Sequence, residues 1–397
     1  MSREITPAKP QAPARRKPES RKDRPGVWKL FVRGVFIVLG LICSVILLAC
    51  GYSGYINPTV HGGYWGALGL AFPFALAATL LLIIFALIFW RRGAIIPALA
   101  MLACWGPILD YCPLHVLGRT APEGSRILRV MTYNVCSFED QHPEQNEASG
   151  RNRTLSTILN SGADIVCLQE TETFVPWGNN LIKPQDMQRL SEIYPYILRT
   201  DVHMMLLSKY PTESVRLNLN RKKFGADCDA FRVHIDEDMD LTVFNLHLQS
   251  LGLNKDDKEL YKGLAQGNTD ELRNEISLFK TELLSKVAAA CVSRAGQADT
   301  IAQFVDRFGG PNVLVCGDFN DVSDCYAIRR LRRTGLREVY PEVGFGPIIT
   351  FNADYFYFGI DHVLYKGDLR PLSLTKGTIP SSDHYPLTVE FEIKRKK

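Results

Sequence analysis

The sequence lacks the short motifs of three familiar chemistries. None of its 397 residues forms a Walker A loop, a His-Glu-x-x-His pair or a Cys-x-x-Cys pair. These absences exclude P-loop nucleotide hydrolysis, zincin-type proteolysis and zinc-ribbon sites. The stretch HGGYWG at residues 61–66 superficially matches an esterase oxyanion loop, but no Gly-x-Ser-x-Gly motif accompanies it, so it predicts a tight turn.

Charge is nearly absent from one long segment. Between residues 34 and 118 the only formally charged side chains are Arg91, Arg92 and Asp110. The apolar runs are long enough to cross a bilayer, which takes about 20 residues per helix. We therefore predict a membrane region at 34–118 with about three transmembrane helices. They are expected at Val35–Tyr55, Trp65–Trp90 and Ala94–Leu117.

The third of these crossings is irregular. It contains Pro97, Pro107 and Asp110, so we expect a kinked or re-entrant segment. An acid inside a membrane span is a functional candidate by default, but Asp110 lies near the end of its span, which favours an interfacial position.

The first 33 residues have the opposite composition. They carry ten Lys and Arg against three acids and little that could form a core, so we predict a disordered cytoplasmic tail at 1–33. The loop from Gly51 to Tyr64 has no Lys or Arg. By the positive-inside rule, three crossings then place the chain after Leu117 on the periplasmic or extracytoplasmic side of an inner or plasma membrane.

The remaining residues have no basic excess. With the tail and the apolar segment set aside, they hold 34 Lys and Arg against 38 Asp and Glu, a net charge of about −4. A domain that holds nucleic acid on a basic face has a different balance. The basic run Arg329, Arg330, Arg332 and Arg333 predicts the solvated face of a helix.

Six cysteines fall in this remainder. Cys167 and Cys316 lie inside apolar strands, which favours small buried hydrophobic side chains. Disulfides are the alternative in an oxidising compartment, and the sequence leaves both interpretations open.

Short apolar runs alternate with helical patterns from residue 126 onward. RILRVMTYNV predicts a strand that ends at Asn134, and DIVCLQET a strand that ends at Glu170, with a helical stretch between them. LTVFNLHLQS and NVLVCGDFN predict two more strands, and the segment from Lys255 to Phe308 is expected to be largely helical. This order predicts a layered α/β domain at 119–397.

Polar side chains follow several of these strands where each one ends. They are Asn134, Glu170, His247, Asp318, Asn320, Asp361, Asp383 and His384. Each alone has an ordinary structural explanation, such as a turn, a helix cap or a solvated strand end. Together they supply the oxygen and imidazole groups of a site, and loops at strand ends are where sites commonly form.

With these residues in place, the sequence resembles the endonuclease/exonuclease/phosphatase superfamily of DNase I-like metal-dependent phosphohydrolases. The resemblance covers residues 126–393 and rests on TYNV, LQET, NLHL, GDFN, IDHV and SDHYP, in that order. It implies a four-layer α/β sandwich, in which two mixed β-sheets lie face to face with helices outside.

The resemblance also implies a divalent-metal site. Glu170 would be the main carboxylate ligand of Mg²⁺, or of Mn²⁺, with Asn134 and Asp383 nearby. Mg²⁺ prefers oxygen ligands and keeps several waters, so few protein ligands are needed.

Five residues would act on the phosphate. Asp318 would orient or deprotonate the attacking water, and Asn320 would hold that water or the phosphate in line. His247 and His384 would donate hydrogen bonds to the non-bridging oxygens of the phosphate. Asp361 would pair with His384, which fixes its tautomer and keeps it protonated.

Two features fall outside this scheme. His362 lies on the opposite face of its strand from Asp361 and is expected to be structural. A charged insertion, NKDDKELYKGLAQGNTDELRNE, contains Lys255, Lys258 and Lys262; contact with an anionic substrate is one interpretation, and a solvated helix face is favoured.

The expected protein is a membrane-anchored, Mg²⁺-dependent phosphoesterase that cleaves phosphodiester or phosphomonoester bonds with metal-activated water. A lipid head group is the expected substrate class, because tethering raises the local concentration near lipid. The alternatives are a nuclease that acts on DNA or RNA and a non-catalytic membrane binding protein that retains the domain. The sequence does not indicate any protein partner.

Overall fold

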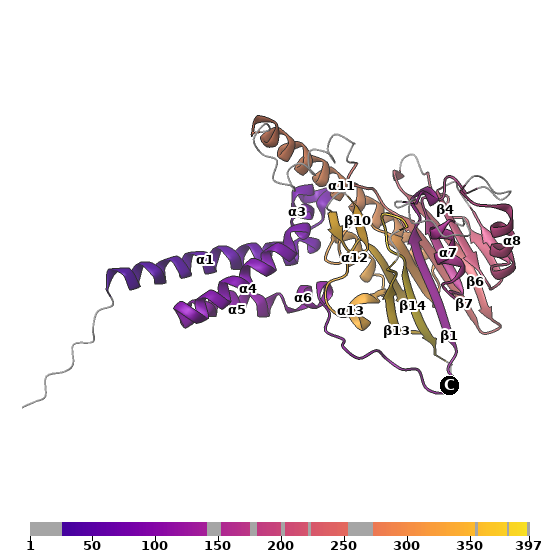
Figure 1. The fold of residues 1–397 in the computed structure, drawn as a ribbon, viewed down its shortest axis with the longest axis horizontal. Coiled ribbons are helices and arrows are strands. Elements are labelled where there is room, and N and C mark those ends of the chain that lie inside the picture. Colours follow the sequence, from indigo (N-terminus) through magenta and orange to yellow (C-terminus); the bar gives the residue numbers. More distant parts are fainter. Residues whose placement is uncertain are drawn as a thin grey trace, which may run out of the picture.

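A computed structural model describes residues 26–140, 152–174, 181–199, 203–220, 224–252, 273–353, 356–378 and 381–394. Two six-stranded sheets lie face to face, and apolar helices of the N-terminal part extend away from them (Figure 1). The predicted tail up to residue 25 and most of the charged insertion, with its three lysines, lie outside the described residues.

The first sheet has the strand order β13-β14-β1-β2-β4-β3. Its strands are β13 (Leu369–Lys376), β14 (Leu387–Ile393), β1 (Ile127–Asn134), β2 (Ile165–Gln169), β4 (Met204–Ser208) and β3 (Tyr196–Leu198). Only β1 and β2 run parallel, and their register pairs Asn134 with Gln169. Both strands therefore end at the same edge of the sheet, and Glu170 follows directly.

The second sheet has the order β5-β6-β7-β8-β12-β9. Its strands are β5 (Thr212–Val215), β6 (Asp227–Asp236), β7 (Met239–His247), β8 (Val313–Asp318), β12 (Asp361–Lys366) and β9 (Arg337–Glu338). Again one pair, β7 and β8, is parallel, and it brings His247 opposite Asp318. Antiparallel β12 places Asp361 on the other side of Asp318. Backbone register alone thus makes neighbours of three predicted site residues.

The core between the sheets explains why they stay together. Alternate residues of both sheets, such as Val130 of β1 and Val243 of β7, are fully buried in one cluster. Cys167 and Cys316 belong to this cluster as free thiols, which confirms the prediction of small buried side chains. Since each sheet has a second apolar face, both need a further covering layer.

Helices supply that covering layer. The helices α7 (Arg153–Leu159) and α8 (Pro184–Ile193) pack on the first sheet, and α11 (Arg273–Phe308) and α12 (Tyr326–Arg332) on the second. The result is four layers, helix, sheet, sheet and helix, and the predicted fold class is confirmed. A two-stranded antiparallel sheet of β10 (Phe351–Ala353) and β11 (Phe356–Phe358) lies beside the sandwich, where the backbone of Phe351 pairs with that of His384.

The predicted membrane region contains two helical segments long and apolar enough to cross a bilayer, Val27–Tyr55 and Gly63–Phe89. They include α1 (Val27–Tyr52) and α4 (Phe72–Phe89). The helices α5 (Ile95–Ala103) and α6 (Trp105–Tyr111) form a third span only if taken together, because they bend by 66° at Cys104. The predicted kink in the third crossing is thus confirmed.

Two predicted boundaries in this region are wrong. The first helix begins at Val27, so residues 27–33 are helical and do not belong to a disordered tail; Val27, Trp28, Leu30 and Phe31 extend the apolar run. The third segment ends at Tyr111, not at Leu117. Residues beyond it run extended along the β-sandwich, where the Gly346 N–H donates to the Pro113 carbonyl.

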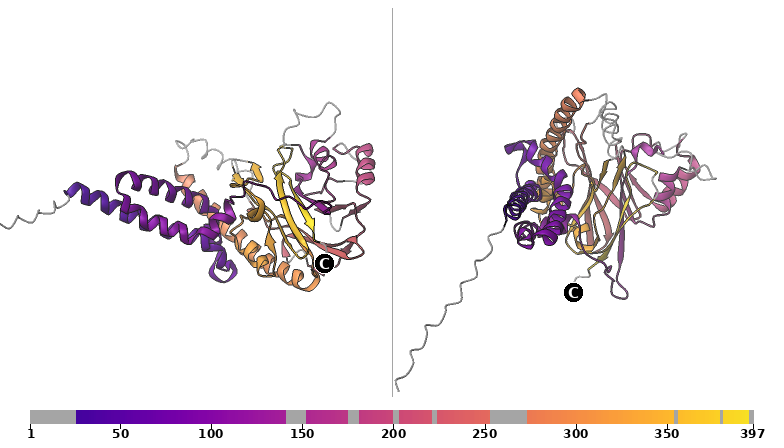
Figure 2. Two further views of the ribbon diagram at one scale, coloured as in Figure 1. Left: turned by 90° about the horizontal axis from the view of Figure 1, so that it is seen from below. Right: turned by 60° about the vertical axis from the view of Figure 1, so that its left-hand side comes forward.

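The connection between α1 and α4 packs on the sandwich. It contains η1 (Ser53–Tyr55), α2 (Pro58–His61) and α3 (Gly63–Ala67), and Figures 1 and 2 show α3 beside α11. A β-carbon on Gly63 would lie 1.8 Å from the Ala288 carbonyl oxygen of α11, so this approach requires glycine. Gly62, with φ of 93°, makes the tight turn predicted for HGGYWG.

The interpretation of the basic run as a solvated helix face is wrong for two of its residues. Arg329 of α12 is only 7% exposed and donates to the Tyr55 hydroxyl at 2.9 Å. Arg332 donates to the two carboxylate oxygens of Asp110 at 2.8 and 3.0 Å. These arginines face residues of the predicted membrane region, which the charge pattern could not show.

Candidate active site

Eight predicted polar residues come from loops and strand ends at one edge of both sheets. Glu170 and Asn320 have positive φ angles, 55° and 51°, so the chain turns sharply right after each strand. Gly317 has φ of 141°, and a β-carbon there would lie 1.9 Å from the Leu246 carbonyl oxygen. Glycine therefore permits the close approach that sets Asp318 beside His247.

One buried amide bridges the two sheets. Asn134 Nδ2 donates to Glu170 Oε1 at 2.9 Å and to Asp318 Oδ2 at 3.1 Å. Its own Oδ1 accepts from the backbone N–H of Cys136 at 3.1 Å. Asn134 thus presents a donor to both carboxylates, whereas a metal ligand would present its oxygen.

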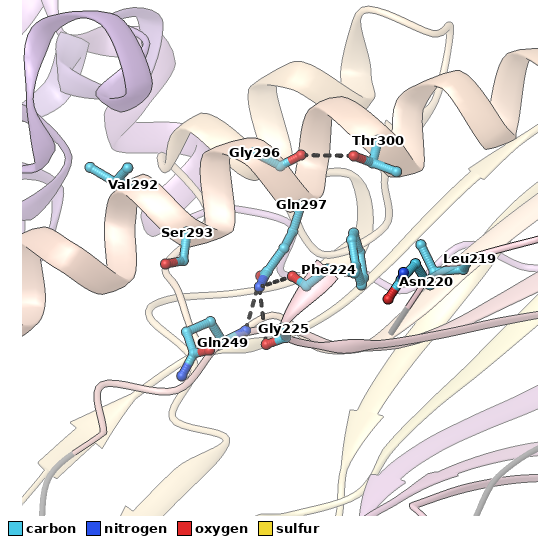
Figure 3. Close-up of a pocket in the computed structure, with 10 residues that line it drawn as sticks. All are labelled: Leu219, Asn220, Phe224, Gly225, Gln249, Val292, Ser293, Gly296, Gln297 and Thr300. Carbon is cyan, nitrogen blue, oxygen red and sulfur yellow. Dashed lines mark hydrogen bonds between the residues drawn. The ribbon is translucent and has the colours of Figure 1, made fainter. Parts of the chain in front are cut away.

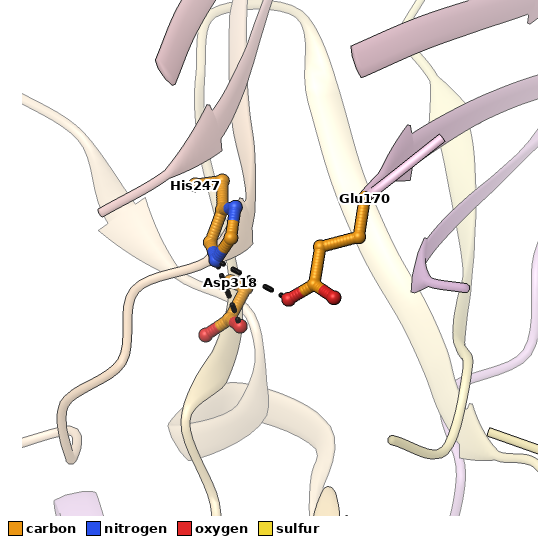
Figure 4. A group of neighbouring side chains, drawn as sticks. All are labelled: Glu170, His247 and Asp318. Atoms are coloured by element: carbon orange, nitrogen blue, oxygen red, sulfur yellow. Dashed lines mark ion pairs between the residues drawn. The ribbon is translucent and has the colours of Figure 1, made fainter. Parts of the chain in front are cut away.

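Glu170, His247 and Asp318 form the first of two compact groups (Figure 4). His247 Nε2 lies 3.6 Å from Glu170 Oε1 and 3.7 Å from Asp318 Oδ2. One ligand atom from each residue falls within 4.8 Å of the others, a spacing that a single cation could span. The two carboxylates supply the oxygen ligands that Mg²⁺ and Mn²⁺ prefer.

Asp318, Asp361 and His384 form the second group, and all three are buried. His384 Nδ1 lies 2.8 Å from Asp361 Oδ2, and Nε2 lies 3.5 Å from Asp318 Oδ2. Burial by itself would lower the pKa of His384, but the carboxylates of Asp361 and Asp318 raise the pKa to about 10. These carboxylates therefore favour the imidazolium form of the ring.

Asp318 belongs to both groups. Burial raises the pKa of its carboxyl, while His384 and His247 act in the opposite direction. The backbone N–H of Asn320 donates to Asp318 Oδ1 at 2.8 Å, which leaves Oδ2 facing Asn134 and both histidines. One oxygen of this carboxylate is thus fixed by its own loop.

The other two predicted residues lie at the margin of these groups. The Asn320 side chain donates to the Leu248 carbonyl at 3.0 Å, so its amide ties the β7 and β8 loops together. Asp383 Oδ1 accepts from Ser382 Oγ at 3.2 Å, and among the described residues it belongs to neither metal-sized group. Its predicted metal role remains a prediction.

Sequence reasoning missed two hydrogen bonds that connect the elements carrying the site residues. Gln169 Nε2 donates to Asn245 Oδ1 at 2.6 Å, a buried link between β2 and β7 of opposite sheets. Ser382 Oγ donates to the Asn134 carbonyl at 2.8 Å. Isolated polar residues inside the apolar runs CLQET and VFNLH were the available signal for the first pair.

A cavity of about 470 Å³ lies beside α11 (Figure 3). Its lining includes Gln297, which donates to the Phe224 and Gly225 carbonyls and accepts from the backbone N–H of Gln249. None of the eight predicted residues lines it. This cavity is therefore separate from the two carboxylate–histidine groups.

Comparison with known proteins agrees with this architecture. The family model described as the endonuclease/exonuclease/phosphatase family matches residues 131–384, a range that contains all eight residues. A domain of unknown function matches residues 33–111. No curated protein matches the chain.

Solved structures with similar folds are distant in sequence. An endonuclease/exonuclease/phosphatase from Beutenbergia cavernae is 15% identical, with a TM-score of 0.43, and the match covers 68% of this chain and 72% of that one. A protein of the same description from Bacteroides vulgatus is 16% identical, with a TM-score of 0.42 and coverage of 68% and 100%. The human Nocturnin catalytic domain with bound sulfate is 16% identical, with a TM-score of 0.40 and coverage of 68% and 95%.

The family match spans more than half of the chain, and the sheets place the matched motifs at one edge. The chain therefore belongs to the endonuclease/exonuclease/phosphatase family of phosphoric ester hydrolases, enzymes that are generally dependent on divalent metals.

Proposed function

We propose that this chain is a membrane-anchored, Mg²⁺-dependent phosphoesterase that cleaves its substrate by attack of water. The observation that carries the proposal is the convergence of Glu170, Asp318, His247 and His384 from both sheets on one small volume. Paired carboxylates and imidazoles in this arrangement suit phosphoryl transfer, in which positioning and electrostatic stabilisation supply most of the rate.

Glu170 would hold the cation, with Asp318 and His247 within reach of it. A bound divalent cation would neutralise charge on the phosphate and on the leaving oxygen. Asn134 keeps Glu170 and Asp318 in place by donating to both. We keep Asn134 beside the proposed metal site as the residue that orients Glu170 and Asp318, since its amide oxygen accepts from Cys136, and we keep Asp383 as a proposed member at the margin.

Asp318 and His384 would act on the reacting groups. Asp318 Oδ1 is fixed by the Asn320 backbone, and Oδ2, which faces Asn134 and both histidines, would accept a proton from water or orient it. His384 is held as an imidazolium by Asp361, so its Nε2–H can donate to a phosphate oxygen. His247 would donate to a second oxygen, and Asn320 would hold the phosphate or the water in line.

A phosphate ester of a lipid head group is our proposed substrate. Helices of membrane-spanning length lie next to the sandwich, and such tethering keeps the site close to lipid. A nuclease is the second candidate, because the family includes nucleases, but the net charge of about −4 outside the tail and apolar segment disfavours it. A non-catalytic binding protein would have no reason to retain two complete carboxylate–histidine groups.

The experiment is a substrate panel with the full chain in detergent. Phospholipids, sphingomyelin, inositol phosphates, DNA and RNA are each incubated with Mg²⁺, and bis-p-nitrophenyl phosphate serves as a general diester. We expect hydrolysis that stops with EDTA and returns with Mg²⁺, with a phospholipid or sphingomyelin cleaved fastest. Metal-independent turnover would contradict the mechanism, and preferential cleavage of DNA or RNA would replace the lipid assignment with the nuclease.

A further inference from the structure

Asp110 of α6 joins the membrane region to the catalytic sandwich through charged side chains. Both of its oxygens accept from Arg332, and Arg329 Nη2 lies 3.7 Å from Asp110 Oδ2. The Asp110 side chain is only 17% exposed. A carboxylate at the end of a membrane segment thus has two arginine partners on a single helix of the soluble domain.

Arg332 also contacts a buried pair, Glu338 and His362. Its Nη2 donates to Glu338 Oε2 at 2.8 Å, and Glu338 Oε1 lies 2.8 Å from His362 Nδ1. Glu338 and His362 are 2% and 4% exposed. Each oxygen of this carboxylate is therefore committed to a different partner.

His362 in turn holds the catalytic loop. Its Nε2 lies 2.8 Å from the carbonyl oxygen of Asp321, the residue after Asn320. A carboxylate and a carbonyl are both acceptors, so the ring donates from both nitrogens. The expectation that His362 is structural is consistent with this position, which supports the GDFN loop from the face opposite Asp361.

A second anchor on Asp321 also reaches the membrane region. Arg294 of α11, fully buried, donates from Nε to Asp321 Oδ2 at 2.9 Å and from Nη1 to the Gln249 carbonyl at 3.0 Å. One turn away, Cys291 meets Gly66 of α3 so closely that a β-carbon on Gly66 would lie 2.8 Å from the Cys291 β-carbon. Both supports of the loop therefore abut residues of the membrane region.

We propose that Asp110 is a positioning residue for the active site, so that the membrane region is a structural part of the catalytic centre. With Asp110 in place, both Arg332 amino groups are occupied and only Nη2 reaches Glu338. Without it, Arg332 is free to bind both oxygens of Glu338 in the bidentate manner that arginine prefers. Arg332 then competes with His362 for Glu338 Oε1, and the support of the Asp321 carbonyl weakens.

The test uses the full chain in detergent and rests, for its kinetic arm, on the proposed hydrolysis. Variants Asp110→Asn, Asp110→Glu, Arg332→Gln and the double variant Asp110→Asn/Arg332→Gln are compared by kcat and KM on bis-p-nitrophenyl phosphate. Hydrogen exchange of the Phe319 and Asn320 amides, which bond to Ile360 and Asp318, is measured in parallel. Arg119→Gln is the matched control, since it breaks an ion pair with Glu342, a residue that makes no hydrogen bond or ion pair with Asp321 or Arg332 among the described residues.

We expect Asp110→Asn to lower kcat by about 3- to 30-fold, with KM changed less than about twofold, and to speed exchange of the loop amides. Asp110→Glu should restore much of the loss, and the double variant should be no worse than Arg332→Gln alone. Arg119→Gln should match the wild type. Unchanged kcat and exchange in Asp110→Asn, or additive losses in the double variant, would overturn the inference.

The two arms separate this inference from the proposed function. If the wild type hydrolyses phosphate esters and Asp110→Asn changes neither kcat nor the exchange of the loop amides, only the positioning role is refuted. A wild type without hydrolysis refutes the proposed function, and the exchange of the loop amides then decides the inference by itself.

Discussion

At the scale of single residues, Glu170 is the side chain on which metal binding depends. It turns out of β2 with a positive φ and brings its carboxylate within 3.6 Å of His247. Glu170→Gln should weaken Mn²⁺ binding, measured by calorimetry on the full chain, by at least about tenfold. Glu172→Gln is the control, because that side chain pairs with His203 and Ser137 away from the groups. Equal weakening by both changes would contradict the assignment.

His384 also predicts a pH dependence of stability. Its folded-state pKa is raised to about 10 from an ordinary value of 6.5, so its pairing with Asp361 and Asp318 contributes fully below pH 6.5 and is lost as pH rises through about 10. In metal-free detergent solution, the Tm difference between wild type and His384→Gln should therefore shrink from pH 6 to pH 10. A difference that stays constant across this range would show that the imidazolium is not stabilised by these carboxylates.

At the scale of elements, the two central parallel pairs position the site. Gly317→Ala would place a β-carbon against the Leu246 carbonyl, at a φ angle that L-residues rarely adopt. The free energy of unfolding should therefore fall by roughly 3 kcal/mol. Gly335→Ala is the matched control: its φ is also positive, but nothing lies within 4 Å of the new β-carbon, so only about 1 kcal/mol is expected. Equal losses in denaturant titrations would refute the role of the close approach.

The strand ends could be predicted because they follow from local pattern. Apolar runs that stop at Asn134, Glu170 and Asp318 predict where each strand ends, and the family motifs place the residues in one site. The orientation of the Asn134 amide could not be predicted, since it depends on the backbone of Cys136 and on carboxylates from two sheets. The links Gln169–Asn245 and Ser382–Asn134 were missed for the same reason, because they join residues distant in sequence.

At the scale of the whole molecule, the largest difference between the sequence-based expectation and the structure concerns the charged residues Asp110 and Arg332. Asp110 and Arg332 are 222 positions apart, so neither composition nor periodicity could pair them. Read as isolated features, the acid suggested an interfacial position and the arginines a solvated face. In the structure the Asp110 carboxylate and the Arg332 guanidinium pair with each other, since a partly buried charge requires an opposite charge nearby.

The packing of the N-terminal helices on the sandwich predicts the orientation of the protein in the membrane. The segment from Ser53 to Ala67 packs on the catalytic sandwich, so sandwich and loop lie at one end of α1, opposite the end where the basic tail begins. With the tail cytoplasmic, we expect the sandwich on the periplasmic or extracytoplasmic face. Protease added to intact spheroplasts should then cleave a tag placed after Lys397 and spare one before Met1. Protection of the C-terminal tag would reverse the orientation.

The Asp318 carboxylate, which both carboxylate–histidine groups share, is proposed to take the proton from the attacking water. The most direct measurement is kcat of Asp318→Asn on bis-p-nitrophenyl phosphate at saturating Mg²⁺, with circular dichroism to confirm folding. Because the amide keeps the shape but cannot take a proton, we predict a loss of at least about 10²-fold. Wild-type turnover by a folded Asp318→Asn protein would contradict the account.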